Sequence, residues 1–264
     1  MKPSGSDYED LIYERQGDLR IVKLNRPKAL NALRKQTFVE LESVLDDFAS
    51  DSQSRALVIT GEGRSFCAGG DAKAMVEMTS EDAAEFARLA HRVLSKMESV
   101  GKPILAAVNG AALGAGSDLA ISCDLVVASE RATFADPSAR LGIITPFGGT
   151  SRLPRIVGPL RAKYLFFTGD SVTAEEALRW GLVNKVVEHD RLMEETLYLA
   201  RRVLSLAPVA VGFNKVLVNS SLGRELRQMD EEEIELYSRC FDTEDRTEGM
   251  RAFIEKRKAE FKGR

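Results

Sequence analysis

Two glycine-rich segments carry the residues of this sequence with the clearest chemical potential. Each follows a run of apolar residues: 61–71 contains Gly69 and Gly70, and 109–118 contains Gly114 and Gly116. Glycine lets the backbone approach a ligand closely, with its N–H groups pointing outward. If two such loops lie at the same end of a parallel sheet, their N–H groups can stabilise negative charge on one oxygen. The pattern indicates an oxyanion hole, although either loop alone is also typical of a tight strand-to-helix turn.

Other catalytic classes find less support in the sequence. The spacing Gly110-x-x-x-Gly114-x-Gly116 matches the dinucleotide-binding turn of short-chain dehydrogenases. That turn follows the first strand, whereas here it begins at residue 110, and none of the five tyrosines has a lysine four residues later. The Gly-x-Ser-x-Gly elbow of many hydrolases does not occur. The two histidines, His91 and His189, lack metal-ligand spacing, so we expect no metal site.

The composition predicts a globular chain without a nucleic-acid partner or a membrane span. Of 264 residues, 44% are hydrophobic and 29% are charged, and the net charge is only -3. Cys67, Cys123 and Cys240 are odd in number and form no CxxC pair, which argues against a disulfide framework and favours a reducing compartment. Residues 1–10 lack the apolar core of a signal peptide. We therefore expect a cytoplasmic protein.

The spacing of apolar residues predicts the elements that position the two loops. Short apolar or alternating runs predict strands at 11–14, 19–24, 56–60, 104–108, 124–128 and 183–188. Helical spacing predicts helices at 34–50, 81–100, 119–123, 160–168, 174–180, 192–206, 209–218, 222–241 and 246–261. The alternation of strands and helices before residue 150 favours an α/β domain with a largely parallel sheet. Beyond residue 150 the chain is expected to be mainly helical.

Five ordered motifs resemble those of the enoyl-CoA hydratase/isomerase (crotonase) family, over nearly the whole chain. They are 25–33 (NRPKALNAL), 65–71 (SFCAGGD), 109–118 (NGAALGAGSD), 148–155 (GGTSRLPR) and 243–257 (TEDRTEGMRAFIEKR). The resemblance is specific for the fold and for acyl-CoA binding, and less specific for the reaction. It implies an α/β fold, a right-handed spiral of ββα units in residues 1–200, with a helical C-terminal trimerisation region in 201–264.

The resemblance also assigns residues to the binding of an acyl-CoA thioester. The N–H groups of Gly70 and Ala115 would form the oxyanion hole, and the reactions of the family pass through a thioester enolate whose charge that hole stabilises. Phe253 and Lys256 would reach the CoA nucleotide, either of the same or of a neighbouring subunit. The expected substrate- and CoA-binding residues are Lys28, Ala29, Leu30, Ala68, Gly70, Asp71, Ala72, Gly114, Ala115, Phe253 and Lys256. Coenzyme A belongs to the substrate, so no separate cofactor is expected.

The two carboxyl positions that hydratases of the family use are both altered. Alignment of the motifs puts Asp118 at the first glutamate position and Ser138 at the second. Serine cannot serve as a general acid or base near neutral pH without an activator. The further acid of some dienoyl-CoA isomerases would fall on Pro146. We expect Asp118 to be the catalytic carboxyl and Ser138 to orient water, while Asp136 and Asp71 are expected to hold their loops.

Three functions therefore stay open. The first is an enoyl-CoA hydratase-type lyase that acts on an unsaturated acyl-CoA. The second is an isomerase or other one-base enolate enzyme, and the third is an acyl-CoA-binding protein with little catalysis. Residues 75–80, 143–147 and the C-terminal helices are expected to form the wall of the acyl site.

The chain is also expected to form a homotrimer or a dimer of trimers. Besides the resemblance, two C-terminal helices present apolar stripes that the remaining chain is too short to cover. The stripe residues are Val211, Val216, Leu217, Leu226, Met229, Ile234, Tyr237 and Phe241.

Overall fold

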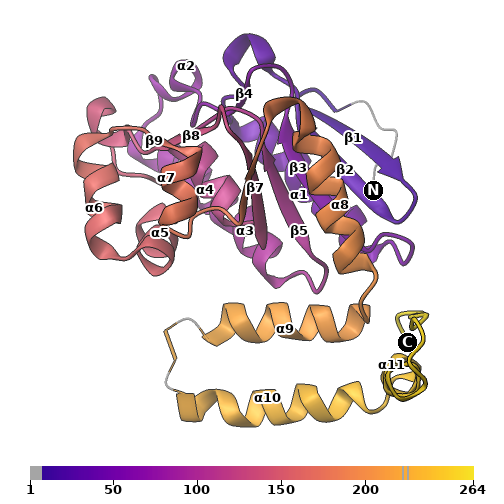
Figure 1. Cartoon of the computed structure of the whole chain (residues 1–264). Helices are drawn as coiled ribbons and strands as arrows, with labels where there is room; N and C mark the ends of the chain where they lie inside the picture. The colour runs from indigo at the N-terminus through magenta and orange to yellow at the C-terminus, as the bar shows by residue number, and fades with distance from the viewer. Residues whose placement is uncertain (1–7, 222, 225) are drawn as a thin grey trace.

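A computed structural model describes residues 8–221, 223–224 and 226–264, and two β-sheets form its centre (Figure 1). The six-stranded sheet has the order β1 (Leu11–Gln16), β2 (Leu19–Leu24), β3 (Ala56–Gly61), β5 (Ile104–Val108), β7 (Leu125–Ser129), β10 (Lys185–Val187). The four-stranded sheet has the order β4 (Ser65–Cys67), β6 (Ala111–Leu113), β8 (Thr133–Ala135), β9 (Val172–Thr173). Pairs β1–β2 and β8–β9 are antiparallel and the remaining pairs are parallel.

Eleven α-helices and three short 3-10 helices complete the described chain. The α-helices are α1 (Lys35–Ser50), α2 (Ala72–Met75), α3 (Ser80–Ser99), α4 (Ala115–Ile121), α5 (Gly149–Val157), α6 (Pro159–Thr168), α7 (Ala174–Arg179), α8 (Leu192–Leu204), α9 (Pro208–Ser221), α10 (Leu226–Cys240) and α11 (Glu244–Glu255). The 3-10 helices are η1 (Pro27–Ala29), η2 (Ser138–Leu141) and η3 (His189–Arg191). All predicted helices and strands are present, with some bounds shifted and with 246–261 shortened to α11.

Successive turns of the chain repeat a ββα unit. Strand β3 enters the large sheet, β4 enters the small sheet, and α3 follows; β5, β6 and α4 repeat the order. Strands β4 and β6 lie in segments that the sequence predicts as glycine-rich loops. Each has only three residues, so its side chains are too few to show a two-residue period. Helix α5 was also missed, because its sequence begins with glycine and contains Pro154.

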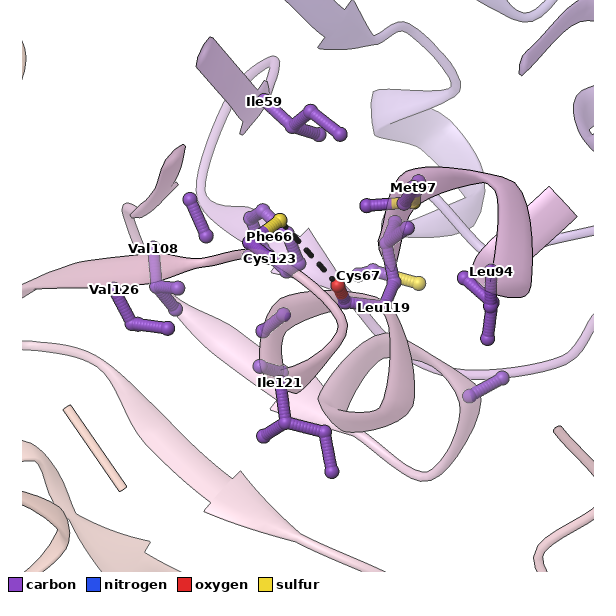
Figure 2. Close-up of a cluster of buried hydrophobic side chains, with 14 of the residues drawn as sticks. Ile59, Phe66, Cys67, Leu94, Met97, Val108, Leu119, Ile121, Cys123 and Val126 are labelled. Atoms are coloured by element: carbon purple, nitrogen blue, oxygen red, sulfur yellow. Dashed lines mark hydrogen bonds between the residues drawn. The ribbon is translucent and has the colours of Figure 1, made fainter. Parts of the chain in front are cut away.

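Both faces of the large sheet are buried, which explains the continuous apolar runs of its strands. In β3, Leu57 and Ile59 face the layer that contains α1 and α3, whereas Val58 faces α8. Figure 2 shows a part of the first layer around α4, where Cys123 Sγ lies 3.6 Å from the carbonyl oxygen of Leu119. Burial raises the pKa of the Cys67 thiol to about 12. This thiol is therefore neutral and packs as an apolar group.

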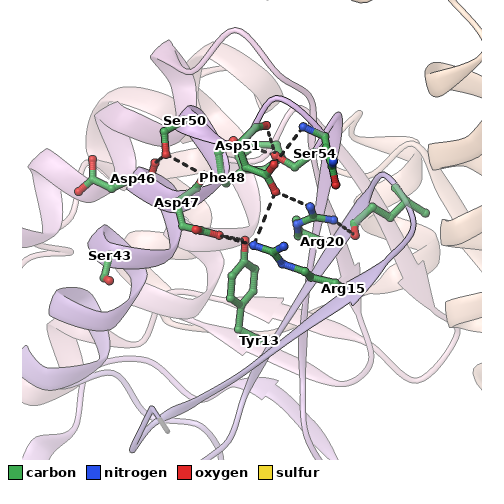
Figure 3. Close-up of polar contacts among 12 residues, drawn as sticks. Tyr13, Arg15, Arg20, Ser43, Asp46, Asp47, Phe48, Ser50, Asp51 and Ser54 are labelled. Atoms are coloured by element: carbon green, nitrogen blue, oxygen red, sulfur yellow. Dashed lines mark hydrogen bonds and ion pairs between the residues drawn. The ribbon is translucent and has the colours of Figure 1, made fainter. Parts of the chain in front are cut away.

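A polar cluster joins the N-terminal hairpin to the end of α1 (Figure 3). The Tyr13 hydroxyl donates to Asp47 Oδ2 over 2.8 Å, and the buried Arg20 guanidinium pairs with Asp51. Arg20 also donates to the carbonyl oxygens of Gly17 and Leu19. Because a buried charge is tolerated only when it is paired and hydrogen-bonded, the cluster holds the hairpin in a defined position against the helix.

Helices α9, α10 and α11 extend away from the two sheets (Figure 1). Helix α9 packs on α3, and α10 packs on α9. The side chain of Lys215 in α9 is 6% exposed, and its ammonium group pairs with Asp124 at 2.8 Å. The same group donates to the carbonyl oxygens of Met97 and Lys102 at 2.7 and 3.0 Å. The predicted boundary after residue 200 falls within α8, so the division into 1–200 and 201–264 stays a prediction.

The predicted apolar stripes are only partly exposed. Ile234 and Tyr237 of α10 and Phe241, which follows the helix, are exposed, but Met229 is buried, contrary to expectation. The stripe residues of α9, namely Val211, Val216 and Leu217, are half-buried. Position 222, the predicted start of the second helix, and the side chain of residue 226 lie outside the described part.

Among the described residues, no single helix is long and apolar enough to cross a membrane. The segments His189–Leu204 and Pro208–Ser221 reach that length and apolar composition only when they are taken together, and the chain bends by 105° between them.

Candidate active site

Three neighbouring strands of the small sheet end beside one another, and the candidate site lies at their carboxyl ends. Strand β6 pairs in parallel with β4 on one side and with β8 on the other. The segments that follow are 68–71 after β4, 114–118 after β6, and 136–138 after β8. The carboxyl ends of parallel strands are where α/β proteins bind ligands. The short strands that sequence reasoning missed therefore position all three segments.

The two glycine-rich loops are in contact. A Cβ atom built on Gly69 would lie 2.9 Å from the carbonyl oxygen of Leu113 and 3.9 Å from the amide nitrogen of Ala115. A Cβ on Gly116 would lie 2.2 Å from the carbonyl oxygen of Cys67. Any other residue at position 116 would separate the loops, so glycine is required there by close approach. The sequence predicted this convergence but could not prove it from spacing.

The backbone pattern leaves the N–H groups of Gly70 and Ala115 available to a ligand. Leu33 forms a parallel bridge with Gly70, in which its N–H donates to Gly69 O and its carbonyl accepts from the Asp71 N–H, both over 2.8 Å. In such a bridge the N–H of the central residue points to the opposite side. Ala115 is the first residue of α4, so its N–H has no acceptor within the helix.

Both donors line a cavity of about 280 Å³. Its lining residues are Ala68, Gly69, Gly70, Ala72, Met75, Val76, Gly114, Ala115, Pro137, Ser138, Leu141, Ile143, Pro146 and Phe147. The lining is mostly apolar, and among these residues Ser138 carries the one side-chain hydroxyl. The predicted acyl wall is found in part at 75–76, 143 and 146–147, whereas the C-terminal helices contribute no lining residue. Pro137 and Leu141 were not predicted.

Asp118 is not among the lining residues, but it contacts Thr145, which directly precedes the lining residues Pro146 and Phe147. Its side chain is 2% exposed, and its Oδ2 accepts a hydrogen bond of 2.9 Å from the Thr145 hydroxyl. Burial raises the pKa of the Asp118 carboxyl to about 7; the Thr145 hydrogen bond opposes the rise and the charge of Asp136 adds to it. A carboxyl whose pKa lies near neutrality can both accept and donate a proton at physiological pH.

The other two predicted carboxylates hold loops. Asp136 Oδ1 accepts the backbone N–H of Ser138 over 3.0 Å, which fixes the turn that brings Ser138 to the cavity. Asp71 accepts the N–H of Lys73 at 3.1 Å and pairs with Arg26 at 2.7 Å. Although burial opposes its ionisation, the hydrogen bond and charge of Arg26 hold the pKa of the Asp71 carboxyl below its usual value. These contacts agree with the loop roles expected from the sequence.

The predicted CoA-binding segment lies against the first glycine-rich loop. Besides the bridge at Leu33, the N–H of Ala68 donates to the carbonyl oxygen of Leu30 over 3.0 Å. Lys28 is exposed beside it in η1. The segment contains Arg26, the residue that holds Asp71, so its position is coupled to that of the Gly70 donor.

Phe253 and Lys256 lie elsewhere. Phe253 is 85% exposed, and α11 lies at the end of the molecule opposite to α2, whose residues line the cavity (Figure 1). Contact of these residues with the site of the same chain is not seen, and contact with that of a neighbouring subunit stays a prediction. No group of three metal-ligating side chains occurs within the described ranges.

Comparisons with known proteins agree with this geometry. A family profile described as enoyl-CoA hydratase/isomerase matches residues 14–264. The chain is 44% identical over 260 residues to a short-chain-enoyl-CoA hydratase of Clostridium acetobutylicum, which covers 98% of this chain and 100% of that protein. It is 43% identical to a crotonyl-CoA hydratase of Syntrophomonas wolfei, and the match covers 96% of this chain and 98% of that protein. A crystal structure of enoyl-CoA hydratase from Bacillus anthracis matches with a TM-score of 0.93 at 32% identity. This match covers 97% of the present chain and 100% of the other.

The chain belongs to the enoyl-CoA hydratase/isomerase family. The predicted spiral fold and the predicted class of enzyme, an enoyl-CoA hydratase-type lyase, are confirmed by these matches.

Proposed function

We propose that the protein adds water to the α,β double bond of a short, apolar enoyl-CoA, with Asp118 as its single acid–base group. The observation that carries the proposal is the position of Asp118. It is the third residue after the Ala115 donor in α4, and its pKa of about 7 suits proton transfer in both directions.

The reaction needs one proton to leave water and one to reach the α-carbon. The N–H groups of Gly70 and Ala115 would bind the thioester oxygen, and Ser138 would orient a water molecule. Ionised Asp118 takes a proton from that water as its oxygen bonds to the β-carbon, which moves the π electrons onto the thioester oxygen. Protonated Asp118 then donates to the α-carbon as the carbonyl re-forms. The proton that Asp118 takes from water is the proton that it gives to the α-carbon. Protons and charge therefore balance, and the carboxylate is regenerated.

The substrate class follows from the lining of the cavity and from the relatives. The walls around the two donors are mostly apolar, which favours a hydrocarbon acyl group. The names of two relatives, at 44% and 43% identity, specify short-chain enoyl-CoA and crotonyl-CoA. Crotonyl-CoA, an enoyl-CoA with a four-carbon chain, is therefore the first substrate to test.

Mass spectrometry of crotonyl-CoA incubated with the protein in deuterated water tests the proposal. The native protein should add one D₂O and give a 3-hydroxyacyl-CoA. Asp118→Asn retains size and hydrogen bonding but not the base, and kcat should fall by at least about 10²-fold with little change in KM. Ser138→Ala should have a smaller effect. Full turnover by folded Asp118→Asn would overturn the role of Asp118, and no hydration of any enoyl-CoA would overturn the function.

A shift of the double bond is the second candidate. It is favoured by the absence of a titratable side chain among the cavity-lining residues, because a single carboxyl, that of Asp118, is then the proposed proton carrier. One carboxyl can take a proton from one carbon and return it to another. The same experiment separates the two, because isomerisation introduces deuterium into recovered enoyl-CoA without adding the mass of water.

We also propose that the protein is cytoplasmic and assembles as a trimer or a dimer of trimers. The assembly is supported by the exposed apolar residues of α10 and α11. In it, Phe253 and Lys256 of one subunit would contact the CoA nucleotide bound by another.

A further inference from the structure

The segment between η2 and α5, residues 142–148, touches the cavity and Asp118 with different side chains. Ile143, Pro146 and Phe147 line the cavity. Thr145 is the one polar side chain of the segment, and it contacts Asp118 instead. A single loop therefore connects the wall of the cavity to the carboxyl that lies behind it.

The geometry of Thr145 is restrained by its own covalent structure. Thr145 is β-branched and precedes Pro146; the first feature limits rotation about χ1, and the second limits the backbone to extended conformations. Its side chain is buried, with 5% exposed, so water does not compete for the hydroxyl. The 2.9 Å bond to Asp118 Oδ2 is thus a fixed contact between two buried groups.

The other oxygen of Asp118 is confined as well. A Cβ on Gly149 would lie 2.1 Å from Asp118 Oδ1, so the carboxyl occupies the space that a side chain at 149 would fill. With Oδ1 against Gly149 and Oδ2 bonded to Thr145, the plane of the carboxyl is set. Without the hydroxyl, Oδ2 would lack this donor in a buried site.

We propose that Thr145 is the positioning residue for Asp118, whose hydroxyl fixes the plane of the carboxyl and stabilises its ionised form. The inference rests on the proposed function, in which ionised Asp118 is the base. Thr145 does not touch the cavity and so takes no part in binding the acyl group.

Three other titratable groups act on or near Asp118. The negative charge of Asp136, after β8, disfavours ionisation, and the positive charge of Arg152, in α5, favours it. Arg152 is itself paired with Glu98 at 2.8 Å. The Cys67 thiol in β4 is neutral at physiological pH and contributes no charge. The influences that favour ionised Asp118 are, largest first, the Thr145 hydrogen bond, the charge of Arg152 and the backbone N–H of Phe147.

Carbon-13 NMR titration of labelled aspartate carboxyls measures the effect without turnover, and Asp118→Asn assigns the signal. In Thr145→Val, which keeps shape and removes the donor, the pKa of Asp118 should rise by about one unit. Because hydration requires ionised Asp118, kcat on crotonyl-CoA rises as pH rises through that pKa. In Thr145→Val the midpoint of this rise in kcat should move to higher pH by the same shift as the Asp118 pKa, while KM changes less than about twofold. Thr145→Ser should restore native behaviour.

A matched control is Thr196→Val in α8, which removes a buried hydroxyl that donates to the carbonyl oxygen of Leu192 over 2.8 Å. It should leave the Asp118 titration unchanged. If Thr145→Val does not fold, Thr145→Ala gives the same measurement. An unchanged Asp118 titration in either folded variant overturns the proposal. If Thr145→Val shifts the Asp118 titration but the native protein hydrates no enoyl-CoA, the proposed function is contradicted and the role of Thr145 is not.

Discussion

An aspartate at position 118 holds its carboxyl one methylene closer to its helix than a glutamate would. The carboxyl is buried against Thr145 and Gly149 and does not line the cavity. Shortness of the side chain thus explains both its burial and its raised pKa, because desolvation is the largest cause of the shift. Ser138, which does line the cavity, supplies a hydroxyl at the point where the family pattern has its second acid.

The position of the Asp118 carboxyl can be tested without changing Asp118. Gly149→Ala introduces a Cβ that would lie 2.1 Å from Asp118 Oδ1 and 3.1 Å from Thr145 Cγ2. Because Gly149 begins α5 without a positive φ, alanine itself suits the backbone there. The carboxyl must move, and a displacement of this size lowers kcat by about 10²-fold. Steady-state kinetics on crotonyl-CoA, with butyryl-CoA affinity by calorimetry, would show lost turnover with retained binding.

Gly101→Ala is the matched control for that substitution. A Cβ on Gly101 would have no atom within 4 Å apart from its chain neighbours, and the φ of Gly101 is not positive. It should leave kcat unchanged. Equal losses in both variants would point to a general effect on stability, and native turnover in Gly149→Ala would show that Asp118 does not need its observed position.

The residues of the site that sequence could predict are those defined by local pattern. Gly70, Ala115 and Ser138 stand in motifs that could be aligned with the family, and all three line the cavity. Thr145 could not be recognised, because its role depends on a contact with a residue 27 positions away that no periodicity records. Gly149 belongs to the motif at 148–155, but its proximity to Asp118 likewise depends on the tertiary structure.

At the level of elements, long segments were predictable and very short ones were not. Helices α1 and α3 and strands β3 and β5 have enough residues to show a period of 3.6 or a continuous apolar run. The three-residue strands β4, β6 and β8 have no such signal, yet they form the sheet that brings the three site segments together. Pairing with neighbouring strands, rather than propensity, decides their structure.

One buried lysine contributes to the attachment of α9 to the core, beside the packing of α9 on α3. Lys215→Met removes the donor to the carbonyl oxygens of Met97 and Lys102 and leaves the Asp124 carboxylate without its partner. Loss of one partner of a buried ion pair should lower the free energy of unfolding by about 3–5 kcal/mol. Urea denaturation gives this value, and hydrogen exchange should show faster exchange in α9 and α10 than in the native protein.

Exposed Lys163 on α6 provides the control, since Lys163→Met makes the same change at the surface. It should change stability by less than about 0.5 kcal/mol. If Lys215→Met unfolds like the native protein and exchanges no faster in α9, the lysine does not hold the helix, and packing of α9 on α3 alone would have to explain its position.

At the scale of the whole molecule, the last two helices, α10 and α11, present apolar side chains that this chain leaves uncovered. On α10 these include Ile234 and Tyr237, which are 59% and 65% exposed, and on α11 Phe253 and Ile254, which are 85% and 77% exposed. Clustered exposed apolar residues of this size are typical of an interface. A closed assembly of identical chains would cover them, since closed symmetry is usual among soluble homo-oligomers.

Sedimentation velocity at micromolar concentration should therefore give at least three times the chain mass of 29.1 kDa. Tyr237→Glu places a charge within the proposed interface and should shift the protein toward monomer, because burying an unpaired carboxylate is strongly unfavourable. Val39→Glu, at an apolar α1 position of 46% exposure, is the control and should retain the assembly. Tyr237→Glu should also weaken crotonyl-CoA binding, if Phe253 and Lys256 reach a neighbouring site. A native protein that sediments as a monomer contradicts both the assembly and that contact.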